Sequence, residues 1–298
     1  MGAPLSAWLV FPLVLGGAMG AGFALMPHLG PPLTVALCEG TAAIVILVCE
    51  RRWPFRAEWN RSHGDLRTDI LHVLVSGIGV TNLVKPLATA AGVALAGWLS
   101  GLLGAGLWPG QWPLPAQLAL ALVAVELPQY WLHRWQHEHD FLWRFHAVHH
   151  SAPRLYWLNA ARFHPVDLAL LYAVGYVPLV AVGAGAELIA HFALFDAVFG
   201  MLQHCNVEIR LGPLNRVFSM AEPHRWHHSR TLAEANTNYG SNLIVWDLVF
   251  GTFFLPSGRR PPQNIGISDM PDFPAGYLAQ LASPFSWKRL ARDGLARP

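Results

Sequence analysis

Charge is scarce in this chain. Only 13% of its 298 residues are Asp, Glu, Lys or Arg, whereas soluble globular domains carry about 25%. Cytosolic enzymes, disordered chains and nucleic-acid-binding proteins all need many more charged groups in contact with water, so the composition argues against all three classes. The net charge of +2 is too small to attract a charged partner over a distance.

Cysteine is also nearly absent, with three residues in the whole chain. Cys38 and Cys49 lie in apolar runs and Cys205 stands alone, so neither a disulfide framework nor an iron–sulfur cluster can be built from them. Hydrophobic residues, in contrast, make up 53% of the sequence, and there are 15 histidines and 13 tryptophans.

Long runs without charge predict membrane spans. Residues 1–38 contain no Asp, Glu, Lys or Arg, and residues 6–26 alone are enough to cross a hydrocarbon core of about 30 Å as a helix. This segment lacks the basic start of a cleaved signal peptide, so we expect it to be retained. Residues 33–49 predict a second span, and the arginine-rich loop after it marks the cytoplasmic side. Its arginines are Arg51, Arg52, Arg56, Arg61 and Arg67.

Two further spans are predicted at 69–87 and 114–132, because an even number of crossings keeps the histidine-rich region that follows on the cytoplasmic side. Between them, the Gly-rich residues 88–110 predict a re-entrant or interfacial helix. Residues 168–203 are apolar but interrupted near 183–187, which predicts a hairpin that dips into the bilayer.

The fold class is therefore an all-α integral membrane protein with about four transmembrane helices plus re-entrant or interfacial helices. We divide it into a membrane-spanning region (1–113), a catalytic region with the histidine motifs (114–255) and a tail that follows the surface (256–298).

Three histidine clusters follow the predicted spans. They read HRWQH, HAVHH and HRWHH, and their histidines are His133, His137, His146, His149, His150, His224, His227 and His228. Residues three and four apart share one face of a helix, so each cluster presents two or three imidazoles together. Eight such ligands exceed the four of a structural zinc site and predict two metal ions. His28, His63, His72 and His191 lie outside the clusters, and we expect ordinary polar roles for them.

Imidazole ligands suit iron, copper or zinc, and the lack of thiolate excludes the softer alternatives. We favour two irons, because many neutral donors retain a metal pair that binds O2 and changes oxidation state; zinc can still occupy the site in purified protein. A non-catalytic zinc-binding membrane protein and a metal transporter are the alternatives from another class. A transporter would place ionisable residues in the middle of its spans, whereas these histidines gather at span ends.

The sequence around these clusters resembles the fatty acid hydroxylase/sterol desaturase superfamily of membrane di-iron oxidases. The resemblance lies in YWLHRWQHE (130–138), LWRFHAVHHS (142–151) and HRWHH (224–228). RFHP (162–165), NYG (238–240) and WDLVFGT (246–252) strengthen it. The similarity covers about residues 115–255, and it is specific to the superfamily but weak on the substrate.

The resemblance implies that the eight clustered histidines bind iron and that a ninth ligand, His204, comes from residues 203–206. His164 is either a ligand or a residue that orients one. Supporting roles near the metals are expected for Glu138, Asn238, Asp247 and Glu208. For Glu138, an exposed position paired with Arg134 is an equally good interpretation.

The resemblance also implies a membrane enzyme that uses O2 to hydroxylate a C–H bond of a lipid of the fatty acyl, sterol or alkylglycerol type, with desaturation as the nearest alternative. The chain has no nucleotide-binding glycine motif and no haem-attachment motif, so a separate reductase and carrier must supply the electrons. We expect the site on the cytoplasmic side of a plasma membrane if the source is bacterial, or of the endoplasmic reticulum if it is eukaryotic. Nothing in the sequence sets the oligomeric state.

Overall fold

The fold was obtained as a computed structural model, and the structure describes residues 4–103, 107–267, 270 and 272–293. Within these ranges every extended regular element is a helix. The longer helices are α1 (Leu5–Leu29), α2 (Pro31–Arg52), α4 (Thr81–Leu103), α5 (Leu114–Glu138), α6 (Asp140–His150) and α9 (Ala186–His204). The shorter α-helices are α3 (Leu66–Leu71), α7 (Pro165–Leu171), α8 (Val177–Ala181), α10 (Ala221–His227), α11 (Leu232–Ala235), α12 (Val245–Phe250), α13 (Tyr277–Ala282) and α14 (Trp287–Asp293). Short 3-10 turns cover Ala57–Asn60, Trp157–Ala161, Gly212–Arg216 and Ser283–Ser286.

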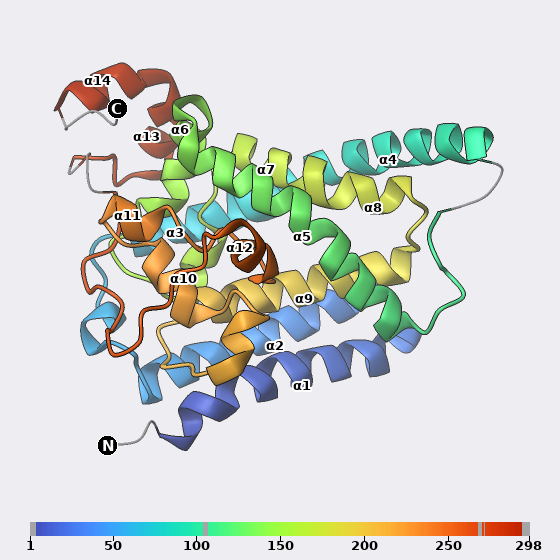
Figure 1. Ribbon diagram of the computed structural model, residues 1–298, viewed down its shortest axis with the longest axis horizontal. Coiled ribbons are helices and arrows are strands. Elements are labelled where there is room, and N and C mark those ends of the chain that lie inside the picture. Colours follow the sequence, from blue (N-terminus) through green and yellow to red (C-terminus); the bar gives the residue numbers. More distant parts are fainter. Residues whose placement is uncertain (1–3, 104–106, 268–269, 271, 294–298) are drawn as a thin grey trace.

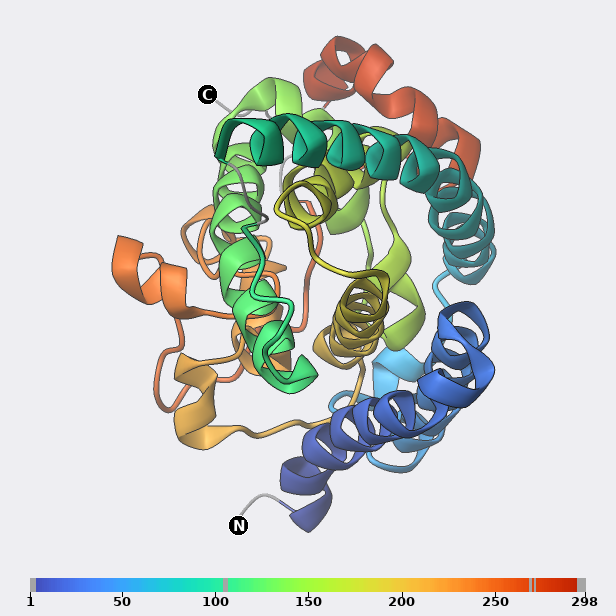
Figure 2. The ribbon, with the colours of Figure 1, turned by 90° about the vertical axis from the view of Figure 1, so that its right-hand side faces the viewer.

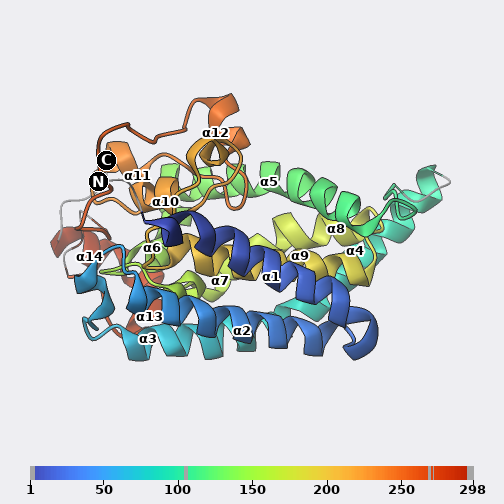
Figure 3. The same cartoon turned by 90° about the horizontal axis from the view of Figure 1, so that it is seen from below.

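The helices α1, α2, α5 and α9 run along the longest axis of the molecule, and most of the short helices gather at one end (Figure 1). In the end-on view of Figure 2, α4 crosses over the others. Both chain ends lie at that end, which we call the site end because it holds the histidines (Figures 1 and 3). Seen end-on, α9 lies between the α1–α2 hairpin and α5 (Figure 2), and it packs against all three. The apolar core of the bundle is formed mainly where these helices meet.

Four of the described helices are long and apolar enough to cross a membrane, so the chain is a membrane protein. The first two, α1 and α2, contain the predicted spans 6–26 and 33–49. Gly30 joins them with φ of 75°, a conformation that a residue with a side chain adopts only at a cost. Pro31 then starts α2, where its missing N–H costs nothing.

The third span is longer than expected. Residues 66–103, which join α3, a π-helical segment (His72–Val80) and α4, form one apolar helix of 38 residues, or roughly 57 Å. The predicted break between a span ending at 87 and a separate helix at 88–110 is therefore wrong, because residues 88–103 continue the helix that begins at Leu66. An interfacial position for this last part stays a prediction, and residues 104–106 lie outside the described part. The glycines in this stretch do not end the helix, because an apolar surrounding favours a backbone that satisfies its own hydrogen bonds. One of them, Gly92, instead allows α4 to pack closely on Val180 of α8.

The fourth candidate span is α9 and not the predicted 114–132. A helix does begin at Leu114 and returns to the site end as α5, but it is less apolar than the four candidates. Gln117, Glu126 and Gln129 of α5 are buried inside the protein, so its polar face packs against its neighbours, while residues such as Val123 stay exposed. The expected hairpin at 168–203 is confirmed: α7, a π-helical segment (Tyr172–Tyr176) and α8 run one way, and α9 runs back after a turn at Gly183.

The tail packs against the site end. Trp287 of α14 forms a small apolar cluster with Trp143 of α6. Closer to the membrane-spanning part, Thr68 of α3 donates to the Ala275 carbonyl at 2.8 Å, and His72 is 2.9 Å from the Gln280 side chain. The tail thereby joins helices that are far apart in the sequence.

Candidate metal centre

Nine histidines converge at the site end in two groups, and all nine are buried. Within each group, the nitrogens that face one another all lie within 4.8 Å. The first group is His133, His137, His146, His150 and His227, and the second is His149, His204, His224 and His228. The structure thus brings together all eight histidines of the three clusters and the predicted ninth residue, His204.

A sharp reversal between two helices builds the first group. His133 and His137 lie one turn apart on the buried face of α5, which ends at His139 with extended backbone. α6 starts immediately and folds back over α5, so its histidines face theirs. The Nε2 atoms of His133 and His146 are 3.1 Å apart, as are those of His137 and His150.

The second group joins α6 to α9 and α10. His204 is the last residue of α9, and its Nε2 lies 2.9 Å from Nε2 of His224 on α10. His228 follows α10 directly, and its Nε2 is 3.0 Å from that of His224. Two imidazoles bound to one metal ion at 2.0–2.1 Å have their nitrogens about 3 Å apart. The four measured separations fit such shared coordination.

Hydrogen bonds behind the rings fix their orientation. In six of the nine histidines the Nδ1 atom has an oxygen acceptor, and this arrangement directs Nε2 toward the shared centre. The pairs are His133 with the Tyr239 carbonyl (2.7 Å), His137 with Asn236 (3.3 Å), His146 with Asp167 (2.9 Å), His149 with the Arg162 carbonyl (3.3 Å), His204 with Asn159 (3.0 Å) and His227 with the Thr237 carbonyl (2.8 Å).

The electrostatics of the site also suit a metal. Burial, together with the neighbouring imidazoles, lowers the pKa of His149, His150, His224 and His228 well below the usual value. Burial likewise lowers the pKa of His227 to about 3. These rings are therefore neutral near pH 7, which is the form that binds metal. The Nε2 atom of His227 is buried without a hydrogen-bond partner, a cost that a bound metal ion would remove.

Three of these acceptors escaped the sequence analysis: Asp167, Asn159 and Asn236. Asp167 is fully buried and also accepts from Gln136 at 2.5 Å. One signal was available for it, because Asp167 is the single charged residue between Arg162 and Glu187. A lone acid in an apolar stretch indicates a specific partner. Asn159 and Asn236 lie in polar loop sequence, where nothing distinguishes them.

A buried ion pair supports the second group from the membrane-spanning part. Arg162, whose carbonyl accepts from His149, donates to Asp69 of α3 at 2.6 Å, and Tyr156 donates to the other Asp69 oxygen at 2.6 Å. Arg162 and Asp69 are both almost completely buried. Removing one member of such a pair is strongly destabilising, because it leaves an uncompensated charge in the interior.

His164 does not join either metal group. Its Nδ1 accepts a hydrogen bond from the Val166 N–H and caps the start of α7, while its Nε2 donates to the Leu281 carbonyl in the tail. We expected His164 either to bind a metal or to orient a ligand, and its hydrogen bonds fit neither role. His72 and His191, for which ordinary roles were expected, also lie outside the groups, as do His28 and His63.

Asp247 supports His133 through the backbone. Its carboxylate accepts the Tyr239 and Gly240 N–H groups at 2.8 Å each and the Thr252 hydroxyl at 2.6 Å. This fixes the peptide whose carbonyl accepts from His133. Gly240 is needed there, because a Cβ atom would lie 2.2 Å from the Leu243 carbonyl oxygen.

Asn238 holds the loop that follows the third histidine cluster. It has φ of 56°, an uncommon left-handed conformation that Asn tolerates. Its side-chain amide donates to the carbonyls of Pro223, next to His224, and of Phe254. Asn238 therefore acts on the position of α10 and not on the metals directly.

The two remaining candidates lie away from the histidines. Glu138 is exposed and pairs with Arg134 at 2.8 Å, which is the alternative interpretation given above. Glu208 pairs with Arg210 at 2.7 Å. The structure brings neither carboxylate to the two groups of histidines.

Comparison with known proteins agrees with this architecture. The family model for fatty acid hydroxylases matches residues 118–252, which include every histidine of both groups. The ornithine lipid hydroxylase OlsE of Rhizobium tropici is 40% identical over 288 residues, covering 94% of this chain and 84% of that protein. The alkylglycerol monooxygenase of Danio rerio is 34% identical over 134 residues, 45% of this chain and 30% of that protein. No solved structure was found to match the chain.

Two comparisons assign the family of this chain. One is a relative that is similar over nearly the whole chain, and the other is a family model that spans all three histidine clusters. The resemblance seen in the sequence is confirmed: the chain belongs to the fatty acid hydroxylase/sterol desaturase superfamily and is an oxidoreductase of the hydroxylase type.

Proposed function

We propose that this enzyme uses O2 and two external electrons to hydroxylate a C–H bond of a membrane lipid at a pair of iron ions. The observation that carries the proposal is the convergence of nine buried histidines in two adjoining groups next to the apolar helices. Zinc needs no such number of ligands, and all-imidazole donors accommodate iron. Bound there, two irons supply the O2 activation that removal of hydrogen from an unreactive C–H bond requires.

The overall reaction balances as one lipid C–H bond, one O2, two electrons and two protons giving one alcohol and one water. The residues of this chain hold and enclose the centre. Asp167, Asn159 and the carbonyls of Tyr239 and Thr237 accept the outer N–H groups and fix the rings. The burial of all nine histidines keeps bulk water away from a site in which side reactions would waste oxidant.

The substrate that we propose is a lipid with an acylated amino acid headgroup, of the ornithine lipid type. The support is the relative that is named for this substrate, since it is similar over 94% of the chain. Alkylglycerol ethers come second, because the monooxygenases named for them match over about half of this chain. Desaturation on the same centre remains the alternative chemistry.

Electrons would come from a separate reductase and a small carrier protein, and we place the site end on the cytoplasmic side. Trp226 supports one point of entry, since it lies between His224 and His227 in the sequence and is almost fully buried. The exposed Arg259 covers its ring, with 4.9 Å from the guanidinium carbon to the ring centroid. An acidic carrier bound at Arg259 would lie against α10, the helix that carries His224 and His227.

Metal analysis and lipid products test the proposal together. The protein is produced in iron-supplemented cells that contain ornithine lipid, purified in mild detergent, and compared with His149→Ala and with the exposed control His63→Ala. We expect two irons per chain in the wild type and in His63→Ala. Cells that produce either of these two proteins should form a lipid that has gained one oxygen atom from labelled O2, and cells that produce His149→Ala should not. One zinc per chain, unchanged in His149→Ala, would contradict the iron centre. A product that loses two hydrogens would establish desaturation.

A further inference from the structure

A cavity of about 340 Å³ lies on the outer surface of the site end, between α6 and the tail. Three of its lining residues are cationic: Arg144 of α6 and Lys288 and Arg289 of α14. The other lining residues belong to the turn between α13 and α14 and include Phe285 and Trp287. The proposed hydroxylation uses none of these residues.

One carboxylate holds the two walls of this cavity together. Asp140, at the start of α6, accepts from Arg144 Nε at 3.0 Å and from the Trp287 indole N–H at 3.0 Å. The Arg144 side chain is thereby fixed at the cavity, while Lys288 and Arg289 are exposed. Three cations against one carboxylate leave an excess of positive charge, so an anion is the ligand that this cavity favours.

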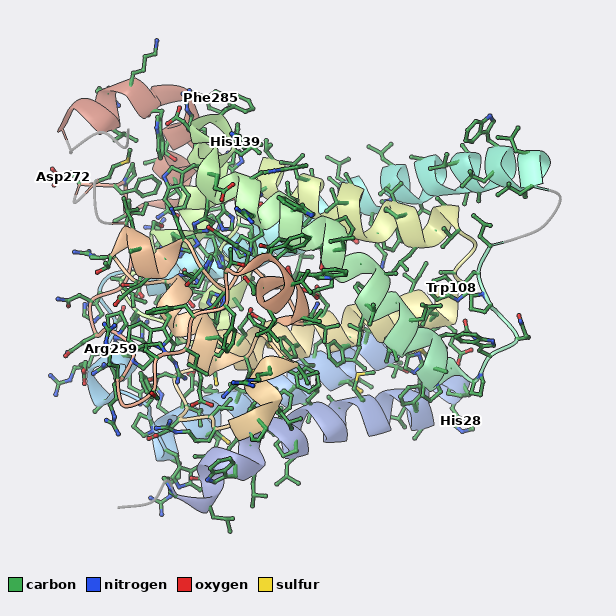
Figure 4. All side chains as sticks on the ribbon, viewed as in Figure 1. His28, Trp108, His139, Arg259, Asp272 and Phe285 are labelled. Atoms are coloured by element: carbon green, nitrogen blue, oxygen red, sulfur yellow. The ribbon has the colours of Figure 1, made fainter. Side chains whose placement is uncertain are left out.

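One large exposed apolar side chain, Phe285, lines the cationic cavity, and the two helices beside it carry further exposed apolar residues. Phe285 is 82% exposed, Leu278 of α13 is 76% exposed and Phe141 of α6 is 65% exposed. Figure 4 shows Phe285 beside the α6 region that begins after His139, at the end of the molecule remote from Trp108 and His28. Keeping such side chains in water is unfavourable. In a membrane protein, exposed aromatic and aliphatic residues beside basic ones indicate contact with the lipid interface.

We propose that this cavity binds the phosphate of an anionic phospholipid headgroup, with Phe285 and Leu278 in contact with the lipid chains beside it. No histidine of the metal groups lines this cavity, so we place the site apart from the one that receives the proposed substrate. Its position gives it a consequence for the centre, because α6 also supplies His146, His149 and His150. A lipid bound to Arg144 and to the tail would strengthen the contact between α14 and α6, the helix that carries these three histidines.

The test measures lipid retention by the full-length protein in mild detergent, using native mass spectrometry with phosphatidylglycerol, phosphatidylcholine or inorganic phosphate added. We expect phosphatidylglycerol to bind in preference to phosphatidylcholine. The double variant Lys288→Gln/Arg289→Gln should bind it roughly 30-fold more weakly, since each basic residue near an anionic lipid contributes about fivefold. The matched control Arg61→Gln/Arg216→Gln removes the same charge from exposed sites elsewhere and should bind normally.

A second variant and a labelling experiment on the wild type distinguish binding of a whole lipid at this cavity from binding of phosphate alone or of lipid elsewhere. Phe285→Ser should weaken phosphatidylglycerol binding and leave phosphate binding unchanged. In the wild type, a photoreactive phosphatidylglycerol should label the peptide that contains residues 283–290. Equal retention of both phospholipids, labelling elsewhere, or free phosphate that binds as tightly as the lipid would overturn the proposal. None of these readouts depends on metal content or on turnover, so their failure leaves the proposed hydroxylase function untouched.

Discussion

His146 and Asp167 form a buried pair in which the ring Nδ1 lies 2.9 Å from a carboxylate oxygen, with both side chains almost completely removed from water. Asp167 sits in the first turn of α7, so the pair connects the second histidine cluster to the hairpin formed by α7, α8 and α9. A carboxylate behind a ligating imidazole fixes its orientation and makes it a stronger donor. Asp167 and Asp247 both support the metal groups in this indirect way.

Asp167→Ala should weaken metal binding without removing a ligand. The substitution deprives His146 of its acceptor, and losses of about 10–100-fold in metal affinity are typical of such changes. Competition with a chelator of known affinity measures the effect. The control is Asp272→Ala, which removes an exposed carboxylate. Equal affinities in the two variants would show that the carboxylate does not act on the metal.

The variants His204→Ala and His164→Ala should differ in metal content, because we expect His204 to bind metal and His164 to hold α7 and the tail in place. His204 belongs to the group of four, so its loss should lower the metal content from two ions to about one. His164 caps α7 and donates to the tail, so its loss should leave both ions in place and lower the melting temperature. Elemental analysis and thermal unfolding of the two proteins are sufficient. Retention of two ions in His204→Ala would remove it from the centre.

Much of this arrangement follows from the sequence for a physical reason. Ligands spaced three and four residues apart share a helix face whatever the surroundings, so the spacing of His146, His149 and His150 was informative. The distinction between α5 and α9 was not, since both are largely apolar helices and α5 falls short of the four candidate spans only through its polar residues, among them Gln117, Glu126 and Gln129. The predicted break before residue 88 was wrong, because glycine interrupts helices in water far more than among apolar neighbours. Asn159 and Asn236 depend on tertiary contacts that leave no local pattern.

Asp247→Ala should destabilise the protein and disturb the first metal group. It leaves the Tyr239 and Gly240 N–H groups buried without an acceptor, and each costs about 1–3 kcal/mol. Thermal unfolding of the metal-free protein measures this cost, and metal affinity reports the effect on His133. Asp247→Asn keeps one acceptor oxygen and should retain part of the stability. If Asp247→Ala were as stable as the wild type, the hydrogen bonds from Asp247 to the Tyr239 and Gly240 N–H groups would not contribute to stability.

Glu138→Gln should behave like the wild type. The Glu138–Arg134 pair is largely exposed, and such pairs contribute about 0–1 kcal/mol. Metal content, melting temperature and lipid product should all be unchanged within error. If turnover fell while metal content stayed constant, Glu138 would have a role in the reaction that its position does not reveal.

Acidification should destabilise the metal-free protein from just below neutral pH. Burial lowers the pKa of His227 to about 3 in the folded state and lowers the pKa of five other histidines of the centre well below its usual value, namely His133, His149, His150, His224 and His228. In the unfolded chain these side chains titrate near 6.5. Below that pH the unfolded state binds more protons than the folded state, so the free energy of unfolding falls as pH falls. The contribution of His227 is therefore complete above about pH 6.5 and declines down to about pH 3.

Thermal unfolding of the metal-free protein between about pH 7.5 and pH 5 measures this decline. The metal-loaded protein is the matched comparison, because bound ions hold the rings in their neutral form and should displace the decline to lower pH. His63→Ala should follow the wild type, since His63 is exposed. A melting temperature that rises on acidification would mean that the folded state takes up the protons, which would require charged histidines in the centre.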